Sequence, residues 1–219
     1  MSKRGQTTAL NIYHLLLDAY GKQRWWPSDS PFEMMVGAIL TQNTNWLNVE
    51  KAITQLKAAD ALDAQTMLDM DETRLRELIR SSGFFRQKAA RLRLFCRFYL
   101  DNGEVNGLRQ LENPRQTLLS LNGIGAETAD SILLYALGMP VFVIDAYTRR
   151  IFARLGLTVT NATYAELQDY FHTQLESDVP LFNEFHALLV QHAKQHCRVN
   201  PVCQNCSLFT ACAFSSQNP

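Results

Sequence analysis

Apolar residues recur every three or four positions along most of this chain, and no other feature limits its fold so strongly. The clearest runs are Leu10, Tyr13, Leu17 and Tyr20; Val49, Ile53 and Leu56; Leu75, Leu78 and Ile79; Leu167, Phe171 and Leu175; and Phe182, Phe185 and Leu189. The two-residue alternation of a half-buried strand is not sustained anywhere, and the apolar run 141–144 is too short to build a sheet. The sequence therefore predicts an all-α fold.

Size and composition exclude several classes of protein. The 219 residues, 47% of them hydrophobic, suffice for one large or two small domains without disulfide bonds. The N-terminal segment lacks the apolar core of a signal peptide. The longest apolar stretch, 132–144, is interrupted by Gly138 and Pro140 and is shorter than the ~18 residues that cross a bilayer. We expect a folded cytoplasmic protein with no membrane partner, in which thiols stay reduced.

Charge is unevenly distributed, although it sums to zero. The chain has 21 Lys and Arg against 21 Asp and Glu, so the total alone indicates no polyanionic partner. The segment 86–97 nevertheless contains only basic charges, at Arg86, Lys88, Arg91, Arg93 and Arg97. This pattern is typical either of a solvated helix face or of a surface that contacts phosphates.

Four of the five cysteines lie close together near the C-terminus, at Cys197, Cys203, Cys206 and Cys212. Thiolates gathered in this way bind zinc or an iron–sulfur cluster. The spacing alone leaves a four-thiolate zinc site and a [4Fe–4S] cluster equally open, with free thiols a weaker third interpretation. Cys96 stands apart, and we expect it in the core as a small hydrophobic residue.

Two features between helical segments indicate where chemistry can occur. The segment 121–130 reads LNGIGAETAD, in which Gly123 and Gly125 can adopt positive φ and let an anion approach backbone N–H groups. By itself this segment is equally a helix end followed by a tight turn. Asp145 stands directly before the helical pattern 146–155, so we expect it to cap that helix.

The order of these parts resembles the endonuclease III superfamily of DNA glycosylases over nearly the whole chain. The motifs that carry the resemblance are LTQNTN at 40–45, SSGFFRQKA at 81–89, LNGIGAETAD at 121–130, GMPVFVID at 138–145 and the cysteines of 197–212. The first cysteine gap is five residues where the family commonly has six, a difference in loop shape. The resemblance implies a helix-hairpin-helix, a catalytic aspartate at Asp145 and a [4Fe–4S] cluster on the four cysteines.

The resemblance also implies a subfamily and a substrate. Bifunctional members have a lysine nucleophile where this chain has Glu127, and a carboxylate cannot form the Schiff base needed for strand cleavage. Trp25 and Trp26, with the motifs that follow them, are similar to the endonuclease III-like 3-methyladenine DNA glycosylases. We therefore predict a monofunctional enzyme of base excision repair, with weak or absent AP lyase activity, that hydrolytically removes alkylated purines such as 3-methyladenine.

Each motif residue then has an expected role on double-stranded DNA that contains a damaged base. The turn Gly123, Ile124 and Gly125 would bind phosphates, helped by Lys88 and Arg91. Gln42 would fill the gap left by the flipped nucleotide. The base pocket would contain Trp25, Trp26, Trp46 and Lys194. The alternative without a binding role is that the two adjacent tryptophans pack in the core and that Lys194 is an ordinary exposed lysine.

The implied architecture has two all-α domains. A six-helix barrel with the helix-hairpin-helix spans 29–139, and residues 1–28 with 140–219 form a second domain that carries the cluster loop. We expect a monomer that associates with the nucleoid when it is bound to DNA. Two other functions remain open, namely a glycosylase for mismatched, deaminated or oxidised bases, and a catalytically degenerate DNA-binding repair protein.

Overall fold

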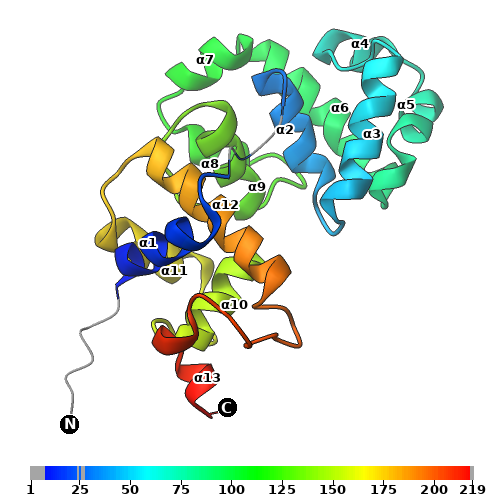
Figure 1. Ribbon diagram of the computed structural model, residues 1–219. Coiled ribbons are helices and arrows are strands. Elements are labelled where there is room, and N and C mark those ends of the chain that lie inside the picture. The colour runs from blue at the N-terminus through cyan, green and yellow to red at the C-terminus, as the bar shows by residue number, and fades with distance from the viewer. Residues whose placement is uncertain (1–7, 24, 26–27, 218–219) are drawn as a thin grey trace. The chain divides into compact units, whose positions relative to one another are not determined.

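The computed structural model describes residues 8–23, 25 and 28–217, and helices account for all of its regular secondary structure (Figure 1). The prediction of an all-α fold is confirmed, since no strand occurs in these ranges. The chain divides into two compact units, one of residues 26–139 and one of residues 1–25 with 140–219. Within the ranges described, no helix combines the length and apolar character that crossing a membrane requires.

The unit of residues 26–139 is organised around one buried helix. Its elements are α2 (Pro31–Leu40), α3 (Trp46–Ala58), α4 (Ala64–Asp69), α5 (Glu72–Leu78), the 3-10 helix η1 (Arg80–Ser82), α6 (Phe85–Asp101), α7 (Glu104–Gln110), α8 (Pro114–Leu119), α9 (Ala126–Ser131) and the π-helix η2 (Ile132–Ala136). Every residue of α2 after Pro31 is buried, because α3, α6, α9 and η2 all pack against it. Ser30 caps α2 and Pro31 starts it, which fixes where this central helix begins.

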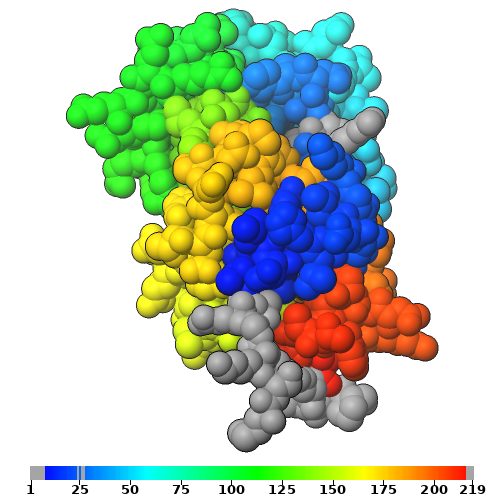
Figure 2. All heavy atoms as spheres, turned by 60° about the vertical axis from the view of Figure 1, so that its left-hand side comes forward, coloured from blue at the N-terminus to red at the C-terminus, as the bar shows by residue number. Residues whose placement is uncertain are grey.

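The other unit is organised around α12. Its elements are α1 (Ala9–Tyr20), α10 (Ala146–Leu155), α11 (Tyr164–Gln174), α12 (Val179–Gln195), the 3-10 helix η3 (Phe209–Ala211) and α13 (Ala213–Gln217). Both α1 and α10 pack against α12. On the face shown in Figure 2, α1 in blue lies beside the C-terminal segment in red.

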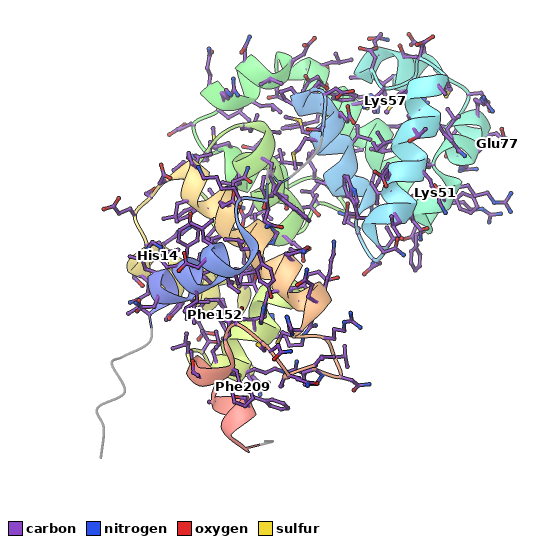
Figure 3. The ribbon with its side chains drawn as sticks, viewed as in Figure 1. His14, Lys51, Lys57, Glu77, Phe152 and Phe209 are labelled. Atoms are coloured by element: carbon purple, nitrogen blue, oxygen red, sulfur yellow. The ribbon has the colours of Figure 1, made fainter. Side chains whose placement is uncertain are left out.

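Aromatic rings fill the core of this second unit. The rings of Phe142 and Phe171 are stacked with centroids 3.9 Å apart, and Phe185 meets Phe142 edge to face. Phe152, labelled in Figure 3, packs edge to face against Phe171. These rings are at most 1% exposed, so they anchor the irregular segment that leads to Asp145.

Candidate functional site

Asp145 is the N-cap of α10, as its position in the sequence predicts. Its backbone is extended, with φ −101° and ψ 179°, and its Oδ1 accepts a hydrogen bond from the backbone N–H of Thr148 at 2.7 Å. The positive end of the helix dipole favours a negative charge at this position. The helix therefore fixes one oxygen of the carboxylate and stabilises its ionised form.

The residues before Asp145 are held by one face of α11. The N–H of Phe142 donates to His172 Nε2 at 3.0 Å, and its carbonyl accepts from Gln168 Nε2 at 2.8 Å. The N–H of Ile144 donates to the Tyr164 hydroxyl at 3.3 Å. Because these three partners are four residues apart on one helix, they share a face and hold the extended segment without a neighbouring strand.

A histidine that the sequence analysis did not single out faces the carboxylate of Asp145. His186 Nε2, on α12, lies 3.4 Å from Asp145 Oδ2, and the two side chains are only 6% and 11% exposed. Burial alone would raise the pKa of Asp145. The charge of His186 and contacts with His186 and Thr148 outweigh burial, so the pKa of Asp145 lies below its ordinary value.

This environment suits a fixed negative charge. A carboxylate with a lowered pKa is ionised at neutral pH and is a weak proton acceptor. Placed beside a reacting sugar, it would stabilise positive charge that develops there, and it retains some exposure through which a substrate can approach.

The glycine turn lies between α8 and α9. Gly123 has φ +88°, and a Cβ placed there would lie 2.4 Å from Arg91 Nε, so this position requires glycine for two reasons. Gly125 has φ −89°, so of the two glycines only Gly123 uses the positive φ that both can adopt, and the space around Gly125 is open. Ile124 is 6% exposed and anchors the turn in the core.

Gln42 and Arg91 are both bound to this turn. Gln42 Nε2 donates to the carbonyl of Gly123 at 2.9 Å and to Thr128 Oγ1 at 3.0 Å. Gln42 Oε1 accepts from Arg91 Nη1 at 2.6 Å. The structure thus brings together three parts that the sequence places far apart, and both side chains support the turn from within their unit.

Lys88 does not reach the surface, and its expected contact with a phosphate is wrong. The side chain is 1% exposed, and Nζ donates to the carbonyls of Leu40 at 2.8 Å and Ser82 at 2.6 Å. Burial, followed by the charge of Arg91, lowers the pKa of Lys88 to about 8. This ammonium is a structural donor that joins the end of α2 to η1.

Two of the residues expected in a base pocket are neighbours. Lys194 Nζ lies 5.5 Å from the centroid of the Trp25 ring, which is a cation–π contact within one unit. Trp46 starts α3 in the other unit, and Trp26 lies outside the described residues. Glu127 is exposed in the first turn of α9, where its charge suits the helix dipole.

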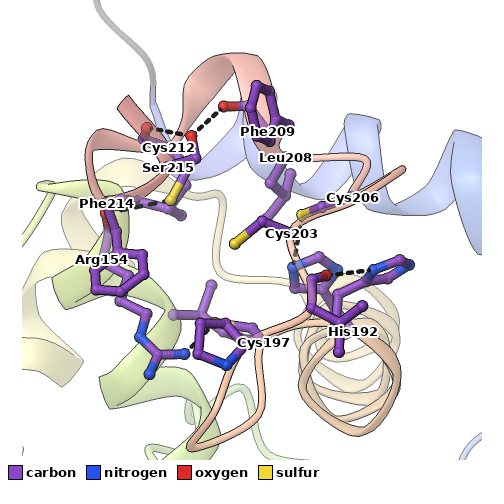
Figure 4. Close-up of a pocket in the computed structure, with 15 residues that line it drawn as sticks. Arg154, His192, Cys197, Cys203, Cys206, Leu208, Phe209, Cys212, Phe214 and Ser215 are labelled. Atoms are coloured by element: carbon purple, nitrogen blue, oxygen red, sulfur yellow. Dashed lines mark hydrogen bonds between the residues drawn. The ribbon is translucent and has the colours of Figure 1, made fainter. Parts of the chain in front are cut away.

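The four C-terminal cysteines line one pocket (Figure 4). All four are free thiols, as is Cys96, which is 0% exposed in the core as predicted. Arg154 Nη1 donates to Cys197 Sγ at 3.4 Å, and His192 Nε2 lies 3.8 Å from Cys206 Sγ. In the part of the chain that is described, no three His, Cys, Asp or Glu side chains are placed to hold a single metal ion.

A second residue that the sequence analysis did not single out is Phe84. It has φ +46° and is 60% exposed, although it precedes α6 directly. Left-handed backbone is strained for an aromatic residue and is retained mainly at functional sites. The signal in the sequence is Gly83-Phe84-Phe85, two aromatic residues after a glycine, of which only the second fits the apolar register of the helix.

The structure thus contains two all-α units, a glycine turn before α9 and an aspartate at the start of α10, which are parts that the resemblance to the DNA glycosylases implies. The chain belongs to the HhH-GPD superfamily of base excision DNA repair proteins. The sequence model of this family matches residues 36–176.

Three known proteins show how far the similarity extends. MJ1434 of Methanocaldococcus jannaschii, whose name describes it provisionally as a DNA repair glycosylase, is 47% identical over 206 residues, 92% of this chain and 94% of that protein. The H. pylori 3-methyladenine DNA glycosylase bound to 1,N6-ethenoadenine is 30% identical, with TM-score 0.77 over 86% of this chain and 98% of that chain. An endonuclease III trapped in a covalent intermediate with DNA shares the fold, with TM-score 0.82 and 22% identity over 97% and 99% of the two chains.

Proposed function

We propose that this protein is a monofunctional DNA glycosylase, acting as a monomer, that removes alkylated purines such as 3-methyladenine from double-stranded DNA. The observation that carries the proposal is Asp145, a carboxylate held in its ionised form at a helix N-terminus. A protein that only binds DNA has no need of such a group, which argues against a degenerate repair accessory.

The mechanism assigns one task to Asp145. The damaged nucleotide is flipped out of the duplex, and cleavage of its N-glycosidic bond leaves positive charge on the sugar. The carboxylate of Asp145 stabilises that charge and orients the attacking water. The glycine turn, supported by Gln42 and Arg91, is proposed to bind the phosphate backbone through its N–H groups.

The absence of a lysine at position 127 supports hydrolysis without strand cleavage. A Schiff base requires an amine, and Glu127 offers a carboxylate on the first turn of α9. Water is then the nucleophile, and the product is an intact strand with an abasic site.

The aromatic residues and the similarity to the H. pylori enzyme support the proposed substrate class. The ring of Trp25 can stack on a flipped base and attract a cationic purine through its quadrupole. Lys194 already lies over that ring, and its charge would repel a cationic base. This contact is the observation that favours the second candidate, a glycosylase for a neutral damaged base such as a deaminated or oxidised one.

Asp145→Asn tests the catalytic assignment. Asparagine caps a helix as well as aspartate does, so fold and DNA binding should be kept while the negative charge is lost. We expect single-turnover base release to fall at least ~10²-fold. Wild-type enzyme should release 3-methyladenine from methylated DNA faster than it produces alkali-labile sites in G·U, G·T or thymine glycol duplexes. Full activity of Asp145→Asn would overturn the proposal.

We further propose that the four cysteines hold a [4Fe–4S] cluster. Four free thiols line one pocket, and thiolates are the ligands of iron–sulfur clusters, as the resemblance implies for these four cysteines. Such a cluster would order the segment 197–212. Metal analysis should find iron and not zinc. Cys203→Ser should lose that iron, whereas Cys96→Ala should retain it.

A further inference from the structure

His186 is a buried polar residue on a helix whose neighbouring side chains are apolar. Phe185 and Leu189 on α12 are both 0% exposed, and His186 itself is 5% exposed. An imidazole in such surroundings is unfavourable unless a polar group compensates for its lost hydration. Its Nε2 lies 3.4 Å from Asp145 Oδ2, and the carboxylate supplies that compensation.

The two oxygens of the Asp145 carboxylate therefore have different partners. Oδ1 accepts from the N–H of Thr148 at 2.7 Å, and Oδ2 faces His186. With Oδ1 alone held, the carboxylate could still turn about its Cβ–Cγ bond, because that torsion is broad. The contact of His186 at Oδ2 restricts that rotation.

We propose that His186 is a positioning residue, which holds the carboxylate of Asp145 in the orientation and charge state that base excision requires. This inference rests on the proposed function, in which Asp145 is the catalytic carboxylate. His186 acts through Asp145 and does not contact the sugar. Positioning of this kind matters because a displacement of about 1 Å at a reacting group can reduce the rate ~10²-fold.

The charged side chains nearest in sequence to this pair on α10 and α12, and the titratable hydroxyl of Tyr164 on α11, have partners of their own. On α10, Arg149 donates to the carbonyl of Ala162, and Arg150 donates to the carbonyl of Cys197. On α12, Glu184 accepts from the N–H of Gln23. From α11, the Tyr164 hydroxyl accepts from Ile144. Burial is the largest influence on the pKa of Asp145 and raises it, and the charge of His186 is the largest influence that lowers it, so removal of His186 should raise this pKa.

Two substitutions separate positioning from packing. His186→Phe fills the space with an apolar ring, as its neighbours do, and removes the polar contact. His186→Gln retains an N–H donor at the end of a side chain of similar reach. We expect single-turnover base release to fall on the order of 10²-fold in His186→Phe and to recover most of that loss in His186→Gln. Affinity for the damaged duplex should be unchanged in both.

The ionisation of Asp145 supplies a second readout, which needs no substrate. Carbon-13 NMR of the Asp145 carboxyl should show a pKa below the ordinary value in the wild type and a higher pKa in His186→Phe. Because the pKa of Asp145 is higher in His186→Phe, the fall in the rate of base release at acid pH should begin at a higher pH in this variant than in the wild type.

The results distinguish the two hypotheses. If the wild type releases no damaged base but the Asp145 pKa rises in His186→Phe, the proposed function fails and the role of His186 in holding the carboxylate stands. If base release is normal in His186→Phe, or both variants slow equally with the Asp145 pKa unmoved, the positioning role is refuted and His186 only fills space.

Discussion

Replacing Lys88 by methionine tests whether this basic residue belongs to the interior or to the DNA-binding surface. Methionine keeps the aliphatic stem and removes the ammonium, which donates to the carbonyls of Leu40 and Ser82. A buried carbonyl left without its donor costs about 1–3 kcal/mol. The shift of the Lys88 pKa from 10.5 to about 8 corresponds to roughly 3 kcal/mol for burying the charge, a cost that methionine avoids. Two carbonyls lose their donor, about 2–6 kcal/mol together, so after the roughly 3 kcal/mol that methionine avoids we expect a net change at pH 7 between a gain of about 1 and a loss of about 3 kcal/mol in the free energy of unfolding.

The effect of this substitution should depend on pH in a defined direction. Between pH 8 and 10.5 the unfolded chain binds more protons at Lys88 than the folded chain does, because the folded pKa is the lower one. The free energy of unfolding of the wild type therefore rises with pH through this window, relative to that of Lys88→Met. The difference in stability between the two proteins should be larger at pH 10 than at pH 7.

Guanidinium denaturation at several pH values measures the stability, and titration of a DNA duplex over a range of salt concentrations measures the phosphate contacts. The control is Arg86→Met, on the same helix but exposed, which should leave stability unchanged within about 0.5 kcal/mol. Lys88→Met should not alter the salt dependence of DNA binding. A stability difference that does not change between pH 7 and pH 10, together with a salt slope reduced by about one, would refute the reasoning, because the reduced slope is the signature of a lost phosphate contact.

Three other substitutions test the candidate site. Gly123→Ala should destabilise the protein by about 1–3 kcal/mol and weaken DNA binding, since it combines positive φ with a clash against Arg91, whereas Gly125→Ala meets open space and should be neutral in thermal unfolding. Glu127→Lys restores an amine, so borohydride should trap an enzyme–DNA adduct that the wild type does not form, and no adduct would contradict the assignment of this position. Phe84→Ala removes an exposed ring from strained backbone, so it should weaken binding to the damaged duplex without loss of stability, and a lower melting temperature would indicate a structural role instead.

The features that the sequence predicts well are those with local causes. Apolar spacing of three and four identifies helices because it describes the buried face of a single element. Asp145 caps α10 because capping depends on the residue and the helix that follows it. Gly123 needs positive φ for the same local reason.

The features that it predicts poorly depend on the register between elements. The charge of Lys88 predicts a phosphate contact, yet this residue lies in the same helical register as Leu92, Phe95 and Tyr99, which are all buried. The helical spacing of these four residues therefore predicts that Lys88 is buried, whereas its charge suggests that it is exposed. The sequence does not predict the role of His186 in the same way. A single histidine between apolar residues is usually a core residue, and only the structure shows that it faces Asp145.

The ionisation of Asp145 also bears on the choice between damaged bases. A carboxylate with a lowered pKa contributes negative charge at neutral pH and cannot act as a proton donor there. An N-alkylated purine already carries positive charge, so it can depart without a proton, and stabilising the cationic sugar is the main task left to the enzyme. A neutral base departs as a poor leaving group unless a separate acid protonates it. An aspartate that His186 and a helix N-terminus keep ionised therefore fits a cationic lesion, whereas release of a neutral lesion requires a proton donor other than this residue.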